Sequence, residues 1–142
     1  MTTTPQSPTP GATEGRLRFR LTYADVDAVQ FYFADYYRWM ERAFAELIDA
    51  AGYPRAAASA DGVGFPVVES GCRYLKRATV DQHLTVVARF GEIGNRSFRV
   101  ECRFLHDDGS VAAEGFTRHV CVDIDAMAAR AVPDAFRTAA GL

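Results

Sequence analysis

An acidic residue lies just before a long stretch with helical periodicity, an arrangement that can hydrolyse acyl compounds. Asp27 belongs to residues 23–32, an irregular segment rich in aromatic residues, and the helix predicted to follow begins near Phe33. The first amides of a helix lack intrahelical acceptors and carry partial positive charge, so they can stabilise an oxyanion. A nearby carboxylate can attack a carbonyl carbon or activate water. An Asp before a helix is also a common cap or turn residue, so the residues alone leave both roles open.

The elements that would position this carboxylate follow from hydrophobic periodicity. Apolar and polar residues alternate over 16–22, which predicts a half-buried first strand. From about 33 to 51, apolar residues recur at spacings of three and four, which predicts an amphipathic helix. We predict further strands at 66–75, 83–90, 97–106 and 111–124, hairpin turns at 91–95 and 107–109, a loop or short helix at 55–64, and a short helix after 125.

This order of elements predicts the α+β class. An antiparallel sheet of about five strands needs a cover for its apolar face, and one long central helix supplies it if the sheet curls around that helix. Such a sheet leaves an edge strand and a groove open, so we expect a homodimer or a homotetramer with sites that use two subunits.

Bulk composition narrows the class of protein. Residues 1–14 are rich in Thr and Pro, which predicts a flexible N-terminal tail before one folded domain at 15–142. Sixteen basic and 18 acidic residues give a net charge of −2, without the footprint of a nucleic-acid or anionic-membrane binder. The chain lacks the apolar run of a membrane span and the pattern of a secretory signal, so we expect a cytoplasmic protein.

Cysteine and histidine do not form a metal-ligand pattern. The three cysteines are odd in number and lack a CxxC spacing, and Cys102 lies in an alternating apolar run that favours a core position. His83, His106 and His119 are scattered, so we interpret them as structural or surface residues. We therefore expect no metal and no cofactor apart from the coenzyme A or phosphopantetheine carried by a substrate.

Residues 25–39 also carry a family resemblance. Asp25-Val26-Asp27 and Asp35-Tyr36-Tyr37-Arg38-Trp39 are similar to the two ends of the D-x-D-x-x-G … N-Y-x-R-W stretch of the 4-hydroxybenzoyl-CoA thioesterase family. Phe65–Leu75, Asp81–Val86 and Arg130–Pro133 resemble its later strands and closing R-x-x-P, so the resemblance spans about residues 16–137. It implies a hot-dog fold and hydrolysis of an acyl or aroyl thioester of coenzyme A or acyl carrier protein.

The resemblance assigns roles position by position. It places the catalytic carboxylate, as nucleophile or general base, on Asp27 and the amide that faces the thioester oxygen on Phe33. Two departures stand beside these matches. The loop is one residue shorter than is usual, with Gln30 near the place of the family's Gly, and Asp35 replaces the Asn. Asp35 could cap the helix, and it adds negative charge near Asp27. These changes suggest a specialised acyl group or a carrier-protein thioester, as in polyketide biosynthesis.

Further residues are candidates for the same site. Glu69, on the strand expected beside it, is a candidate second acid or base, or else a solvent-facing strand residue. Gln30 could position water or the acyl group, and Phe31 and Tyr32 could line an acyl pocket or belong to the helix-entry core.

Basic and polar residues at strand ends suit the phosphates of coenzyme A. They are Lys76, Arg77, Arg96 and Ser97, and the turn that contains the last two resembles a family stretch that contacts the nucleotide. Isolated surface Lys and Arg side chains are also commonly just solvated.

Two other functions stay open. A hot-dog dehydratase would need a His a few residues after its Asp, and none follows Asp27 before His83. A non-catalytic acyl-binding or scaffold dimer is compatible with the shortened loop.

Overall fold

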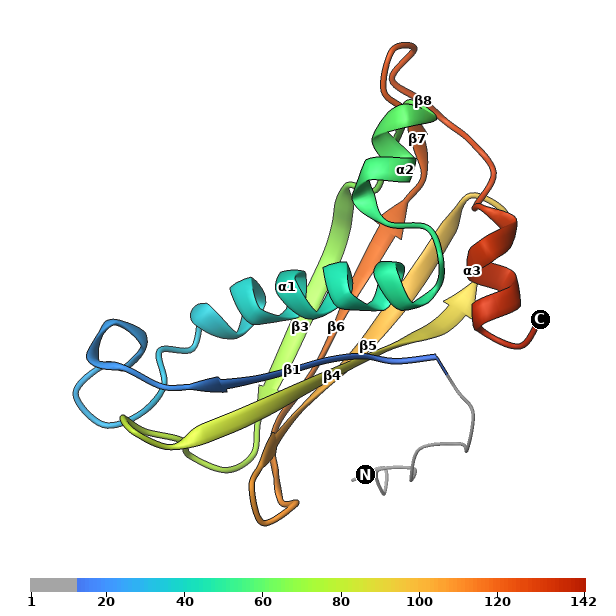
Figure 1. Cartoon of the computed structure of the whole chain (residues 1–142). Coiled ribbons are helices and arrows are strands. Elements are labelled where there is room, and N and C mark those ends of the chain that lie inside the picture. Colours follow the sequence, from blue (N-terminus) through green and yellow to red (C-terminus); the bar gives the residue numbers. More distant parts are fainter. Residues whose placement is uncertain (1–12) are drawn as a thin grey trace.

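A five-stranded antiparallel sheet forms the frame of the structure, a computed structural model that describes residues 13–142 (Figure 1). Most of the predicted tail, residues 1–12, lies outside the described residues. Every neighbouring pair of strands is antiparallel, and β1 and β3 are the edges. In spatial order the strands are β1 (Gly15–Arg20), β4 (His83–Ile93), β5 (Ser97–His106), β6 (Val111–Val120) and β3 (Val67–Tyr74).

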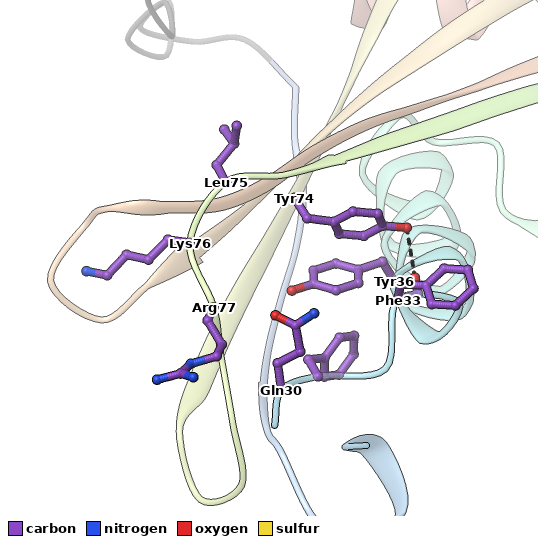
Figure 2. A pocket seen from close by; sticks show the side chains of 8 residues that line it. Gln30, Phe33, Tyr36, Tyr74, Leu75, Lys76 and Arg77 are labelled. Carbon is purple, nitrogen blue, oxygen red and sulfur yellow. Dashed lines mark hydrogen bonds between the residues drawn. The ribbon is translucent and has the colours of Figure 1, made fainter. Parts of the chain in front are cut away.

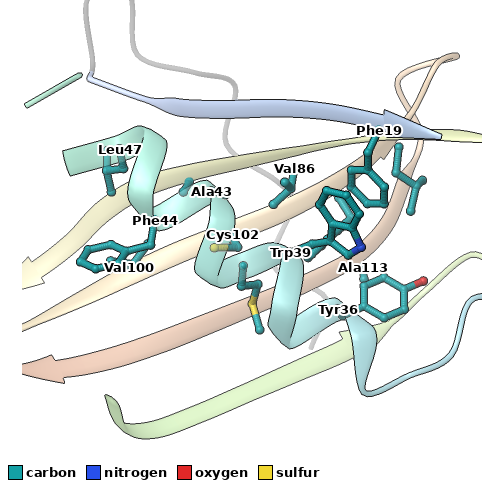
Figure 3. Packing of buried hydrophobic residues seen from close by; sticks show 14 of the residues in the cluster. Phe19, Tyr36, Trp39, Ala43, Phe44, Leu47, Val86, Val100, Cys102 and Ala113 are labelled. Carbon is teal, nitrogen blue, oxygen red and sulfur yellow. The ribbon is translucent and has the colours of Figure 1, made fainter. Parts of the chain in front are cut away.

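One helix, α1 (Asp35–Ala50), lies across the inner face of this sheet (Figure 3). Its apolar positions are spaced by three and four, so they form one stripe that the sheet covers. Phe19 of β1 stacks on Trp39 of α1, with ring centroids 3.6 Å apart. The buried helix residues are Tyr36, Trp39, Met40, Ala43, Phe44, Leu47 and Ile48, and Cys102 is buried beneath them as predicted.

The helix approaches the sheet backbone closely at two glycines. A Cβ atom on Gly115 of β6 would come within 2.6 Å of Met40 Sδ and 3.0 Å of the Gly71 carbonyl oxygen. A Cβ atom on Gly15 of β1 would collide with the α1 backbone at Ala43 and Leu47. Glycine at both positions lets α1 rest directly on the sheet.

Aromatic side chains pack together where α1 ends. Phe44, Phe98 and His119 stack on one another, and α3 (Asp134–Ala139) closes over them with Phe136. All four side chains are buried.

A second, three-stranded sheet differs from the prediction. It consists of β2 (Val63–Gly64), β7 (Val122–Asp123) and β8 (Ala128–Ala129), beside the short helix α2 (Arg55–Ala60). The strand predicted at 111–124 breaks at Cys121, because the Cys121 amide donates to the Arg96 carbonyl and its own carbonyl accepts from Arg130.

Element boundaries also differ in two places. Strand β4 continues to Ile93, through the turn predicted at 91–95. The pairing with β5 shifts its register between Phe90 and Ile93, and this bulge-like irregularity accommodates Gly91 within the strand. Helix α1 starts at Asp35 rather than near Phe33, because residues 32–34 form a turn.

The arrangement confirms the hot-dog fold, a curled antiparallel sheet around one central helix. Between Thr13 and Leu142, no helix is long and apolar enough to cross a membrane.

Candidate functional site

The first carboxylate of the D-x-D stretch is structural. Asp25 ends a short 3-10 helix, η1 (Tyr23–Asp25), and its side chain is buried. Its Oδ2 accepts hydrogen bonds from the Thr22 amide and hydroxyl, both at 2.9 Å, and its Oδ1 accepts one from Arg38 at 2.9 Å. The Asp25–Arg38 ion pair joins the loop to the first turn of α1. This contact is a physical reason for the presence of both an Asp and an Arg in residues 25–39.

The second carboxylate, Asp27, is exposed at the start of a tight loop. Its Oδ1 accepts hydrogen bonds from the amides of Val29 at 2.9 Å and Gln30 at 3.0 Å, and these bonds lower the pKa of Asp27 below its ordinary value of 3.8. Its Oδ2 has no hydrogen-bond partner within residues 13–142. Asp27 is thus a turn residue through one oxygen, while the other oxygen of the ionised carboxylate is available for chemistry.

The loop closes without the glycine of the family pattern. Val26 and Phe31 form an isolated antiparallel bridge, and the Asp27 amide donates to the Gln30 carbonyl at 2.8 Å. No residue of 27–34 has a positive φ. Because this shorter loop never enters the left-handed region, Gln30 can stand near the position of the missing glycine without strain.

Two amides at the start of α1 lack acceptors. Within the part of the chain that the structure describes, the backbone N–H groups of Phe33 and Ala34 donate no hydrogen bond. Asp35, which could have capped the helix, is instead the first helical residue and makes no capping bond. Its carboxylate lies 3.9 Å from Arg38, so an adjacent cation offsets its charge.

A pocket of about 210 Å³ opens beside these amides (Figure 2). Aromatic side chains from the loop, α1 and β3 form much of its wall, and the side chain of Gln30 points toward Tyr36. Burial raises the pKa of the Tyr36 phenol to about 12, so this hydroxyl stays protonated. The lining residues are Gln30, Phe31, Phe33, Tyr36, Tyr74, Leu75, Lys76 and Arg77.

The structure therefore brings five of the predicted site residues to one pocket: Gln30, Phe31, Phe33, Lys76 and Arg77. Asp27 does not line the pocket, but the loop that it opens ends on the pocket wall at Gln30 and Phe31. Tyr32 lies between two lining residues, and its exposed ring contacts Phe33 with centroids 5.0 Å apart.

The basic residues of the pocket differ in their partners. Lys76, the only lysine of the chain, donates to Ser110 at 2.9 Å and lies 3.4 Å from Asp108. Arg77 is exposed and forms no ion pair within the described residues. Its guanidinium is therefore free for an external anion.

Three predicted residues lie away from the pocket of their own chain. Glu69 precedes Tyr74 by five residues on β3, roughly 17 Å along the strand, and the alternation of β3 places it on the other sheet face. Arg96 and Ser97 adjoin Val120 at the opposite end of β6 from the pocket. Within one chain, these residues cannot contact a ligand held beside Phe33.

Two aromatic residues of the pocket, Tyr36 and Tyr74, were not among the predicted site residues, although both line it. Tyr74 donates a hydrogen bond to the Phe33 carbonyl oxygen at 3.0 Å. The available sequence signal for Tyr74 was its place near the end of the strand predicted at 66–75, two residues before the basic Lys76-Arg77 pair.

None of the three histidines lines this pocket. His119 is buried, with Nδ1 2.9 Å from the Phe65 carbonyl oxygen and Nε2 2.8 Å from the Thr117 hydroxyl. A carbonyl only accepts, so Nδ1 carries the proton and Nε2 accepts from Thr117. Among residues 13–142, no group of three or more His, Cys, Asp or Glu side chains is placed to hold a metal ion.

Comparison with known families assigns most of the chain to one of them. The profile of a family described as the thioesterase-like superfamily matches residues 21–140, from the end of the first strand to the last helix. A search of curated protein sequences finds no match.

Solved structures with the same fold include two that share at least a quarter of their residues with this chain. BH1999 gentisyl-coenzyme A thioesterase is 26% identical, with a TM-score of 0.77, and covers 86% of this chain and 98% of its own. The protein TT1821 from Thermus thermophilus is 30% identical, with a TM-score of 0.80 and coverage of 89% and 97%.

A more distant structure shares the fold alone. The DHNA-CoA thioesterase from Staphylococcus aureus is 19% identical, with a TM-score of 0.78, and covers 88% of this chain and 85% of its own.

Proposed function

The chain belongs to the thioesterase-like superfamily, and on that basis we propose that it hydrolyses a thioester of coenzyme A in the pocket beside Phe33. The observation that carries the proposal is one short loop. It begins with an ionised carboxylate at Asp27 and leads to a helix-start amide without an acceptor at Phe33. The narrower resemblance to 4-hydroxybenzoyl-CoA thioesterases stays a prediction.

The proposed reaction adds water across the thioester. An oxygen bonds to the carbonyl carbon, the carbon–sulfur bond breaks, and the products are a carboxylic acid and a thiol. Asp27 either takes the proton of the attacking water or attacks the carbon itself to give an anhydride that water then cleaves. In both routes the Phe33 amide would donate to the carbonyl oxygen as negative charge develops on it.

The pocket favours a compact acyl group. An enclosed cavity of roughly 150 Å³ holds a benzene molecule. This pocket, which is partly open and combines aromatic walls with polar groups, measures about 210 Å³ in one chain. Its polar groups include the Gln30 amide and the Tyr36 hydroxyl, which suit a ring that carries a hydroxyl group. A hydroxylated aroyl group is therefore the preferred acyl moiety, and the name of the gentisyl-CoA enzyme BH1999 supports this choice.

Basic residues at the mouth of the pocket support an anionic carrier. Arg77 has no ion pair among the described residues, and Lys76 lies beside it. The phosphates of coenzyme A would bind to them. Acyl carrier protein presents the same pantetheine arm without the nucleotide phosphates, so it stays the second candidate donor, as in polyketide biosynthesis.

A second copy of the chain would complete the site. Strand β3 is a sheet edge with exposed Val67 and Val68 at one end and exposed Tyr74 and Leu75 at the other. If two β3 edges pair about a twofold axis, each end faces the opposite end in the partner. This pairing would carry Glu69, Arg96 and Ser97 of one subunit toward the pocket of the other. We propose a homodimer, or a homotetramer built from it, on this ground.

The direct test is to incubate the protein with a panel of aroyl-CoA and acyl-CoA thioesters. Hydrolysis is measured as the release of free thiol. Asp27→Asn removes the charge but keeps a side-chain oxygen for the Val29 and Gln30 amides, whereas Asp27→Ala also removes the turn bonds. We expect the Asp27→Asn variant to have a kcat about 10²–10⁴-fold lower than that of the parent, with an unchanged Tm. A parent without turnover on any thioester contradicts the proposed function, and an active Asp27→Asn contradicts the proposed role of Asp27.

The pH dependence provides a second check. The pKa of Asp27 lies below 3.8 because backbone amides bind its ionised form. The ionised form of Asp27 therefore persists as the pH falls from 7 to 5. Protonation of Asp27 should lower the hydrolytic activity only below about pH 4. A kinetic pKa between 5 and 7 that disappears in Asp27→Asn would contradict this assignment.

A further inference from the structure

Both peptide planes that flank Phe33 are held by their carbonyl oxygens. The Tyr32 carbonyl accepts a hydrogen bond from the Asp35 amide at 2.9 Å. The Phe33 carbonyl accepts one from the Tyr74 hydroxyl at 3.0 Å, drawn as the dashed line in Figure 2. The first bond belongs to the turn before α1, whereas the second comes from a strand 41 residues further along the chain.

A held carbonyl also fixes the direction of the N–H group in the same peptide. The peptide unit is planar and trans, so its N–H points opposite to its C=O. The Tyr32 carbonyl therefore sets the direction of the Phe33 N–H, and the Phe33 carbonyl sets that of the Ala34 N–H. Hydrogen bonds on both planes restrict the rotation of the backbone at Phe33, and they favour one orientation of these two unpaired amides.

We propose that Tyr74 is a positioning residue that holds the helix-start amides of Phe33 and Ala34 in the orientation that receives the thioester oxygen. This role rests on the proposed function and adds a residue to it. Tyr74 acts through the Phe33 carbonyl and need not touch the reacting atoms.

The surroundings of Tyr74 suit this role. Its ring packs edge-on against Tyr36, with centroids 5.0 Å apart, and against Phe33 at 6.4 Å. The backbone after it is tied to β6, because the Leu75 and Lys76 amides both donate to the Ala112 carbonyl. Desolvation raises the pKa of the Tyr74 phenol above its ordinary value of 10.0, so the hydroxyl stays a donor throughout the neutral range.

The competing explanation is that Tyr74 merely forms part of the acyl pocket wall, which it also lines. The two roles predict different kinetics. A wall residue changes substrate affinity, by an amount that depends on the acyl group. A positioning residue changes the stabilisation of the transition state, by a similar factor for every acyl group.

The test is Tyr74→Phe in the full chain, which keeps the ring and removes only the donor. Tyr23→Phe is the matched control, because Tyr23 is 84% exposed and lies outside the pocket. We expect Tyr74→Phe to lower kcat about 5- to 50-fold for all substrates hydrolysed by the parent. That loss is below the ~10²–10³-fold cost of an absent oxyanion donor. KM should stay within about twofold, and the control should match the parent.

Backbone NMR supplies a readout that does not depend on turnover. The Phe33 carbonyl ¹³C shift and the Ala34 amide ¹⁵N shift should move in Tyr74→Phe and stay in place in Tyr23→Phe. An unchanged kcat, or unchanged shifts at Phe33 and Ala34, overturns the positioning role while leaving hydrolysis intact. A raised KM that varies with the acyl group assigns Tyr74 to the wall and also overturns it. A parent that hydrolyses no thioester overturns the proposed function and this role together.

Discussion

Aromatic side chains cluster at both ends of α1, but they are buried at one end and exposed at the other. Beyond its C-terminal end, Phe98 and Phe136 are 1% and 0% exposed, and α3 covers them. At its N-terminal end, Phe33 and Tyr74 are 54% and 45% exposed around an open pocket. The same helix and sheet therefore provide a packed end and an open end.

Polar groups follow the same division. At the packed end, both ring nitrogens of His119 have partners. At the open end, the Phe33 amide and the Asp27 Oδ2 have none within the described residues. Partners that the chain itself does not supply must come from water, a ligand or a second chain. The packed end thus contributes to stability, whereas the polar groups without partners at the open end belong to the site proposed above.

The largest effect that would test this division is on stability. Phe136→Ala at the packed end should lower the free energy of unfolding by about 3–5 kcal/mol, because a fully buried ring leaves a cavity. Phe33→Ala, the same change at the open end, should cost less than about 1 kcal/mol. Urea denaturation of both variants measures the contrast. Equal losses would mean that the open end is as much a part of the core as the packed end.

A smaller effect concerns pH. Burial lowers the pKa of His119 below its ordinary value of 6.5. The unfolded chain then binds this proton at higher pH than the folded chain does. The contribution of His119 to stability is therefore complete above about pH 6.5 and declines as the pH falls below it, by at most ~1.4 kcal/mol per pH unit. Unfolding at pH 7 and pH 5.5 should show this decline in the parent and a weaker one in His119→Gln.

The smallest effect belongs to the mouth of the open end. Arg77→Ala should raise KM for a coenzyme A thioester about three- to fivefold, because an exposed charge pair contributes up to ~1 kcal/mol. The pantetheine thioester of the same acyl group lacks the nucleotide phosphates and should be unaffected. Arg42→Ala, on an exposed part of α1, is the control. Equal effects on both thioesters would assign Arg77 to the acyl group rather than to the phosphates.

Local patterns predicted the main elements well. The alternation in 97–106 and the period of α1 matched the structure because each reflects burial of one face. The predicted strand boundaries were wrong where contacts between residues distant in sequence determine them. Strand β4 crosses Gly91 because β5 pairs with it on both sides of a bulge. The break at Cys121 depends on hydrogen bonds to Arg96 and Arg130.

The site divides in the same way. Gln30, Phe31 and Phe33 are close together in sequence, were predicted as one group, and all three line the pocket. The contribution of Tyr74 depends on which strand becomes the sheet edge, and no local pattern states that. The partnership of Asp25 with Arg38 spans 13 residues and was equally hidden, although both stood in the recognised stretch.

The close approach of α1 to the sheet at Gly15 and Gly115 also bears on how a ligand would enter. At Gly15 the α1 backbone lies against the strand, and at Gly115 the Met40 side chain of α1 does, so the helix is closely packed on the sheet at both points. In the proposed site, this packing would hold the first turn of α1 in place before a ligand binds. The amide end of that site would then be preorganised, and adjustment on binding would fall to the side chains of the loop around it.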